Sequence, residues 1–228
     1  MFRNRSDAGR ILAEQLRPMV SRMALILGLP RGGIPVAFEV ARALGAELDV
    51  CVVRKLGTPG EEELAMGAIA SGGVRVLNQD LIDYWRISDE QLERVTSRER
   101  EELERRERLY REGRPAAHVH GRTVVLVDDG LATGASMLAA CRALRTQEPA
   151  RLLVAAPVAA RQTWSEFREE ADEVVCAATP RTLGAVGLWY EEFRQVTDED
   201  VRQLLEQAAH NTLAEAAGAG VAQAASRR

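Results

Sequence analysis

Short apolar runs alternate with stretches of helical periodicity along most of the chain, which is typical of a parallel β-sheet flanked by helices. Several of these runs are apolar at every position, as expected for central strands buried on both faces. The pattern therefore predicts an α/β fold. The expected strands cover residues 24–29, 48–53, 74–77, 123–127, 152–156 and 174–177.

Helices are expected between these strands at residues 34–44, 136–145 and 161–169, the first of them closed by Gly45 as a C-terminal cap. A longer helix begins at Ser88 and runs to about residue 112. Few of its positions are apolar, so we expect it to be mostly solvated or to pack on a partner subunit. Its arginines and glutamates are interpreted as surface ion pairs.

Other segments interrupt this alternation. Residues 54–73 hold five glycines and one proline, which predicts a long mobile loop. Aromatic residues gather in residues 179–196 of a chain that has few of them. Residues 211–228 are rich in Ala, Gly and Ser without periodicity, which predicts a disordered tail after a domain that spans residues 1–210.

Composition narrows the classes of function. The 228 residues, 46% of them hydrophobic, suit one α/β domain. The 30 Lys and Arg against 34 Asp and Glu give a net charge of −4, so no global basic field attracts nucleic acid or an anionic membrane. The apolar run at residues 23–29 is too short to span a bilayer, and we expect a cytoplasmic protein. Lys55 is the only lysine, which hints at a specific role.

An acidic pair and a turn of small residues follow the apolar run at residues 124–127, and a helix then opens. Ligands bind beyond the carboxyl ends of strands in an open parallel sheet, where this turn is expected. Its backbone N–H groups and the helix dipole favour a phosphate. The residues predicted to bind the phosphate are Ala132, Thr133, Gly134, Ala135 and Ser136.

The acidic pair itself, Asp128 and Asp129, would repel a phosphate, so the two carboxylates are expected to face hydroxyl donors such as a ribose 2′,3′-diol. We expect these loop carboxylates to be partly exposed and to contribute little to stability. The alternative interpretation is a helix-capping cluster without a ligand, because Asp, Ser and Thr commonly cap helices.

The whole run of residues 124–136 resembles the phosphoribosyl pyrophosphate signature of type I phosphoribosyltransferases. The chain resembles most the uncharacterised bacterial members of that family, over most of residues 1–205. The resemblance implies a Rossmann-like twisted parallel sheet with a core at about residues 22–178. It also implies a small hood, built from the N-terminal segment and about residues 179–196, that holds a nucleobase.

The resemblance also implies an activity, which is Mg²⁺-dependent transfer of the 5-phosphoribosyl group from phosphoribosyl pyrophosphate to a nucleobase or similar nitrogen acceptor, with release of pyrophosphate. Arg31, Gly32 and Gly33 stand where the family places its pyrophosphate loop, although a tight strand-to-helix turn explains paired glycines equally well. Arg54 and Lys55 lie at the root of the family's flexible loop, and the resemblance implies that they too bind the pyrophosphate and neutralise its charge as it leaves. The implied catalytic residues are Asp128, Asp129, Lys55 and Arg31.

Further expectations concern Mg²⁺, the acceptor and assembly. Mg²⁺ is expected to be held mainly through the substrate, with Asp128 and Asp129 as candidate ligands. Trp189 and Tyr190 are candidates for stacking on the base or for a small C-terminal core. Ala132 and Trp189 occupy places where 6-oxopurine enzymes carry acidic residues, which weighs against those bases. The family's habit favours a homodimer. The alternative function is a non-catalytic regulator that senses phosphoribosyl pyrophosphate.

Overall fold

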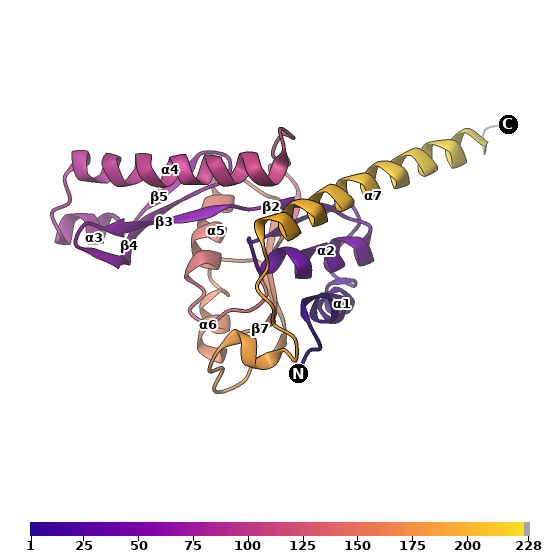
Figure 1. Ribbon diagram of the computed structural model, residues 1–228, viewed down its shortest axis with the longest axis horizontal. Helices are drawn as coiled ribbons and strands as arrows, with labels where there is room; N and C mark the ends of the chain where they lie inside the picture. The colour runs from indigo at the N-terminus through magenta and orange to yellow at the C-terminus, as the bar shows by residue number, and fades with distance from the viewer. Residues whose placement is uncertain (226–228) are drawn as a thin grey trace.

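The structure, a computed structural model that describes residues 1–225, contains a parallel sheet and a smaller antiparallel sheet with helices around both (Figure 1). The parallel sheet has five strands in the order β2-β1-β6-β7-β8, and every neighbouring pair is parallel. The predicted α/β fold is therefore confirmed. Its strands are β1 (Leu25–Gly28), β2 (Glu47–Val50), β6 (Thr123–Val127), β7 (Arg151–Val158) and β8 (Glu173–Ala178).

Two hydrophobic cores cover the two faces of this sheet, because successive residues of a strand point to opposite sides. Ile26 packs in the core under α1 and α2, whereas its neighbours Leu25 and Leu27 pack in the core under α5 and α6. The central strands β1, β6 and β7 are buried on both sides, which explains their apolar runs. The flanking helices are α1 (Arg5–Leu16), α2 (Gly33–Leu44), α5 (Ala135–Arg145) and α6 (Arg161–Glu166).

The predicted helix ends are mostly confirmed. Gly45 ends α2 in the left-handed conformation, with φ of 62°. Ser88 begins α4 (Asp89–Arg111) through a capping box with Gln91. The helix expected over residues 161–169 is shorter, because α6 ends at Glu166.

The segment predicted as a long mobile loop, residues 54–73, is instead ordered in an antiparallel sheet. Two of its strands form a hairpin, and a third strand, Val74–Leu77, pairs with the second. Val74–Leu77, predicted among the strands of the parallel sheet, therefore belongs to the antiparallel sheet. The glycines allow close packing here, since a Cβ at Gly67 would lie 2.5 Å from the carbonyl oxygen of Val76. Leu56 and Met66 are buried. The strands are β3 (Val53–Thr58), β4 (Glu61–Ala70) and β5 (Val74–Leu77).

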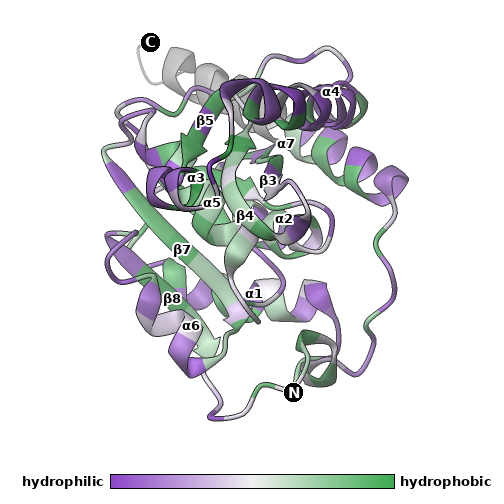
Figure 2. Cartoon of the chain, turned by 90° about the vertical axis from the view of Figure 1, so that its left-hand side faces the viewer, coloured by the Kyte–Doolittle hydropathy of each residue, from purple (hydrophilic) through white to green (hydrophobic). Residues whose placement is uncertain are grey.

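Helix α4 packs against β3, β4 and α7 (Asp198–Ala225), and its remaining surface is hydrophilic (Figure 2). Leu92, Leu103 and Tyr110 are its buried apolar contacts. A short helix, α3 (Gln79–Tyr84), precedes it. None of the helices in residues 1–225 is both long and apolar enough to cross a membrane.

The last helix extends into the segment predicted to be a disordered tail. Helix α7 continues through Ala225 (Figure 1), and the disorder expected from residue 211 stays a prediction. The first part of α7 packs on α2 and β2, so the helix is already nucleated before the alanine-rich stretch begins. Alanine has the highest helix propensity, which favours continuation of the helix. Residues 226–228 of the predicted tail lie outside the described residues.

The two segments assigned to the hood lie together. The backbone N–H of Phe2 donates to the carbonyl of Trp189 at 2.8 Å, and that of Glu191 donates to the carbonyl of Phe2 at 2.9 Å. Trp189 ends the 3₁₀ turn η1 (Val186–Trp189). Phe2 and Tyr190 share a small hydrophobic cluster over the end of β7. The N-terminus is thus anchored close to the carboxyl edge of the parallel sheet.

Candidate active site

The acidic pair lies directly after β6, at the carboxyl edge of the parallel sheet. One oxygen of Asp128, Oδ1, accepts a hydrogen bond from the backbone N–H of Asp129 at 2.8 Å. Oδ2 of Asp129 accepts from Nε of Arg5 at 2.8 Å. Asp128 has no ion-pair partner within residues 1–225, so the two neighbouring acids differ in their surroundings.

Arg5, on the first turn of α1, was not predicted as a site residue. It is 9% exposed, and the side chain of Asp129 is 14% exposed. Its Nη1 donates to the carbonyl oxygen of Arg194 at 2.7 Å, and its guanidinium carbon lies 3.8 Å from the centre of the Phe193 ring. The hydroxyl of Tyr190 donates to the carbonyl oxygen of Asp129 at 2.6 Å. The hood is therefore bound to both the side chain and the backbone of Asp129.

These surroundings shift the acidity of the pair. Burial raises the pKa of Asp128 well above its usual range, and the adjacent Asp129 carboxylate raises it further. Burial also raises the pKa of Asp129, while the charge and hydrogen bond of Arg5 oppose that rise. Two carboxyls beside one arginine leave an excess of negative charge when both ionise. Hydroxyl donors or a divalent cation would stabilise the doubly ionised pair.

The predicted pyrophosphate loop packs against these acids. A Cβ at Gly32 would overlap Oδ2 of Asp129, and one at Gly33 would lie 2.6 Å from the carbonyl oxygen of Val127. Contacts this short do not occur, so both positions require glycine for the loop to lie this close. Arg31 is exposed and lies 3.8 Å from Asp198 of α7. The Pro30–Arg31 peptide bond is cis.

The predicted phosphate turn presents free backbone donors at the start of α5. Ala132 and Thr133 are exposed, and within the described chain the N–H groups of residues 132–134 donate to no protein acceptor. No side chain caps the helix, whose first-turn N–H groups lack intrahelical partners. Gly134 has φ of 69°. Oγ1 of Thr163 donates to the carbonyl of Ala132 at 2.7 Å and so fixes the position of this peptide.

The two cations predicted at the root of the flexible loop have different environments. Nε of Arg54 donates to Oε2 of Glu99 at 2.8 Å, so its charge is already balanced by α4. Lys55 is exposed and forms no ion pair in the described part of the chain. It lines a cavity of about 170 Å³ between the antiparallel sheet and α5, which Ala135 of the phosphate turn also lines. Lys55 and the phosphate turn therefore border the same cavity.

The two aromatic candidates for base binding are also unlike. Tyr190 is buried, with its ring centre 5.4 Å from that of Phe2 and 5.0 Å from that of Phe193. Nε1 of the half-buried Trp189 donates to the carbonyl of Leu183 at 3.1 Å. In this arrangement Tyr190 forms part of the hood's core and contacts the acidic pair, while Phe193 is partly exposed.

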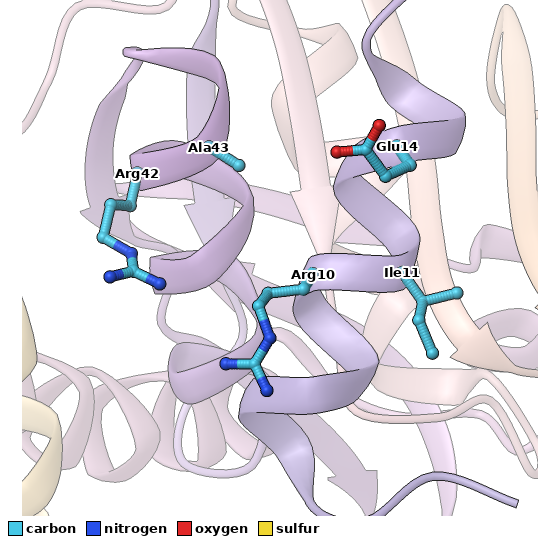
Figure 3. A pocket seen from close by; sticks show the side chains of 5 residues that line it. All are labelled: Arg10, Ile11, Glu14, Arg42 and Ala43. Carbon is cyan, nitrogen blue, oxygen red and sulfur yellow. The ribbon is translucent and has the colours of Figure 1, made fainter.

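A second hollow, of about 490 Å³, lies between α1 and α2 and contains none of the predicted site residues. Figure 3 shows Arg10 and Arg42 projecting from these helices, together with Ile11, Glu14 and Ala43. Within the described residues, no three His, Cys, Asp or Glu side chains gather in a way that could hold a metal ion.

Comparison with known proteins places this geometry among relatives. A family model described as a phosphoribosyl transferase domain matches residues 8–183. A curated protein of Mycobacterium tuberculosis, named "Putative phosphoribosyl transferase Rv0571c", is 45% identical over 216 residues, which are 95% of this chain and 48% of that protein. The chain thus spans about half the length of the curated relatives it matches. The crystal structure of TT1426 from Thermus thermophilus is 48% identical, with a TM-score of 0.82, and the match covers 90% of this chain and 97% of that one.

Proposed function

The chain belongs to the phosphoribosyl transferase domain family, and from this premise we propose that it transfers the 5-phosphoribosyl group of phosphoribosyl pyrophosphate to a ring nitrogen of a nucleobase or similar acceptor. A nitrogen–C1′ bond forms as the C1′–oxygen bond breaks, and pyrophosphate leaves with the bonding electron pair. The observation that carries the proposal is that the glycine loop at residues 31–33 packs against the acidic pair, in the same loop that continues into the open turn at residues 132–136.

The turn before α5 suits the 5′-phosphate. Its unpaired N–H groups point to no protein acceptor, and the helix dipole adds a favourable potential for an anion. The exposed hydroxyls of Thr133 and Ser136 supply further donors. Lys55, which lines the cavity beside Ala135, adds a positive charge close to the turn.

The acidic pair suits the ribose. Asp128 and Asp129 each retain one carboxylate oxygen that accepts no hydrogen bond from the described residues, and a vicinal diol offers two hydroxyl donors. In the transition state the sugar carries positive charge, as in glycoside cleavage. The negative charge of the pair then stabilises that state electrostatically.

Arg31 is the side chain best placed for pyrophosphate. Its guanidinium is exposed and its nearest carboxylate, that of Asp198, is 3.8 Å away, so it is free to turn toward an anion. Guanidinium groups bind phosphate oxygens through paired hydrogen bonds. Arg54 would have to leave Glu99 to take the same role, because that ion pair is formed and partly buried.

The residues present fit Mg²⁺ held mainly through substrate oxygens. Mg²⁺ prefers oxygen ligands and is commonly bound by one or two carboxylates together with phosphates, a set that Asp128 and Asp129 can complete. When bound, it would neutralise charge on pyrophosphate. The protein's own residues do the positioning and supply no covalent chemistry.

The acceptor is assigned only as a class. Trp189 and Ala132 stand where 6-oxopurine enzymes carry acidic residues, which disfavours hypoxanthine and guanine as acceptors. A homodimer remains a prediction, which light scattering of the purified protein would check.

The test is incubation of the protein with phosphoribosyl pyrophosphate, Mg²⁺ and a panel of purine and pyrimidine bases, with the nucleotide product and pyrophosphate both measured. We expect one class of base to give a nucleotide with equimolar pyrophosphate. Tight binding of phosphoribosyl pyrophosphate without turnover of any base would favour the regulatory alternative. Absence of both binding and turnover would contradict the proposal.

A further inference from the structure

Arg5 connects three parts of the chain that are far apart in sequence. It forms its ion pair with Asp129, a hydrogen bond with the carbonyl of Arg194 and a cation–π contact with Phe193. Arginine is rarely this buried without a specific role, because removal of its charge from water is costly unless every contact is made. The fork shape of the guanidinium allows one side chain to bind all three partners at once.

The ion pair also determines which oxygen of Asp129 is free. Oδ2 lies between Nε of Arg5 on one side and the backbone at Gly32 on the other, where a Cβ would overlap it. Oδ1 accepts no hydrogen bond from residues 1–225. The carboxylate is thereby fixed between α1 and the pyrophosphate loop, with a single oxygen left for a ligand.

The neighbouring acid is arranged in the same way by a different donor. Oδ1 of Asp128 accepts the N–H of Asp129, which leaves Oδ2 without a partner in the described part of the chain. The backbone of Asp129 is held in turn by Tyr190, whose hydroxyl donates to the Asp129 carbonyl. Each carboxylate thus keeps one free oxygen, and two oxygens match the two hydroxyls of a vicinal diol.

We propose that Arg5 is a positioning residue for the sugar: by occupying one oxygen of Asp129 and joining it to residues 193–194, it fixes the acidic pair to accept the 2′,3′-diol of the phosphoribosyl group. This inference depends on the proposed function. It assigns the N-terminal helix to sugar recognition. Loss of Arg5 should therefore weaken the binding only of ligands that contain the diol.

The experiment measures two affinities by calorimetry, one for phosphoribosyl pyrophosphate and one for inorganic pyrophosphate, both with Mg²⁺. Arg5→Gln is compared with wild type and with Arg10→Gln. Arg10 lies on the same helix and is half exposed, with only long ion pairs of 3.6 and 3.8 Å. It lines the hollow of Figure 3 and lies outside the proposed site.

We expect Arg5→Gln to weaken phosphoribosyl pyrophosphate binding by about 10- to 100-fold, which corresponds to the loss of a charge-assisted hydrogen bond. Pyrophosphate binding should change less than about threefold, and Arg10→Gln should change neither affinity. An equal loss for both ligands would indicate a general structural role and overturn the inference, as would unchanged binding of both.

Arg5→Lys covers the case in which Arg5→Gln does not fold. Lysine keeps the charge but cannot form the fork to Asp129 and the Arg194 carbonyl together. We expect a smaller loss, several-fold, again confined to the ligand with the diol. Should Arg5→Lys bind both ligands like wild type, the positioning role is excluded. Should wild type bind pyrophosphate but not phosphoribosyl pyrophosphate, the proposed function fails and this inference fails with it.

Discussion

The loop that follows β6 has two halves, which differ in their exposure and in the number of distant residues that bind them. Asp128 and Asp129 are largely covered, and Asp129 is bound by Arg5 and Tyr190, which come from the hood. The turn at residues 132–136 is largely exposed and leaves its N–H groups without protein acceptors among the described residues. The turn accepts a long-range hydrogen bond from the side chain of Thr163, at its first residue, Ala132.

This difference separates two ways of preparing a binding site. The exposed turn depends on local backbone conformation and on the start of a helix, so it needs few distant residues. The acidic half depends on side chains that arrive from both ends of the chain. Substitution of Asp129 should therefore alter sugar binding and folding together, whereas substitutions in the turn should act locally.

The largest expected effect on activity comes from substitution of the two acids, and it tests the difference between the two halves of the loop. Asp128→Asn and Asp129→Asn should each lower kcat/KM by about 10²–10³, since each removes charge that stabilises the transition state. Their stabilities should differ. Asp129→Asn leaves the buried Arg5 without its ion pair and should cost about 3–5 kcal/mol, whereas Asp128→Asn should not destabilise the protein.

Urea unfolding of both variants, alongside product formation, checks this pair of expectations. The buried ion pair of Asp129 argues against the expectation that both acids contribute little to stability, because that expectation considered only exposed carboxylates. Equal stabilities for the two variants would mean that the contact between Arg5 and Asp129 is weak. The acidic half would then depend on distant residues no more than the turn does.

A smaller effect is expected in the turn. Gly134→Ala introduces a Cβ at φ of 69° and within 2.7 Å of Cγ2 of Thr163. We expect a loss of about 2 kcal/mol in stability, of which about 1–2 kcal/mol is the cost of the left-handed conformation. Binding of phosphoribosyl pyrophosphate, measured by calorimetry, should weaken about 10-fold as the turn shifts.

Gly121→Ala is the matched control for this substitution. Gly121 has φ of 71°, but a Cβ there would meet nothing within 4 Å and the residue lies outside the proposed site. It should show the conformational cost alone and leave ligand affinity unchanged. Similar affinities for Gly134→Ala and wild type would show that the turn does not hold the phosphate.

The turn could be predicted from the sequence because its determinants are local. An apolar strand, two acids, small residues and a helix start all lie within residues 124–136, and their order alone indicates an anion site. The same holds for the glycines of residues 31–33, although their contact with Asp129 is a tertiary feature. Most of the parallel strands were also found, because burial on both faces gives a plain apolar run.

Arg5 and the antiparallel sheet could not be predicted in the same way. Arg5 meets Asp129 across 124 positions of the chain, and nothing near Arg5 in sequence indicates that contact. In residues 54–73 the pattern of a hairpin is interrupted by register irregularities around Gly57, and the glycines resemble those of a loop. Their role in close strand packing appears only once the partner strand is placed.

The last prediction concerns how the stability contributed by Asp128 depends on pH. Burial raises the pKa of Asp128 above its usual range, so ionisation of Asp128 opposes folding at pH values above the raised pKa. Asp128→Asn removes that penalty. In metal-free protein at about pH 7.5 the variant should therefore be more stable than wild type.

This advantage should shrink as the pH falls. Below the raised pKa the folded wild type binds a proton at Asp128 while the unfolded chain still does not, so wild-type stability rises relative to the variant until about pH 4, where both states are protonated. Urea unfolding of the two proteins between about pH 7.5 and 5 measures the difference. An advantage that stays constant, or grows as the pH falls, would mean that a contact in the folded protein stabilises the charged form of Asp128. The two acids would then be equivalent, and the free oxygen assigned to Asp128 would have a partner.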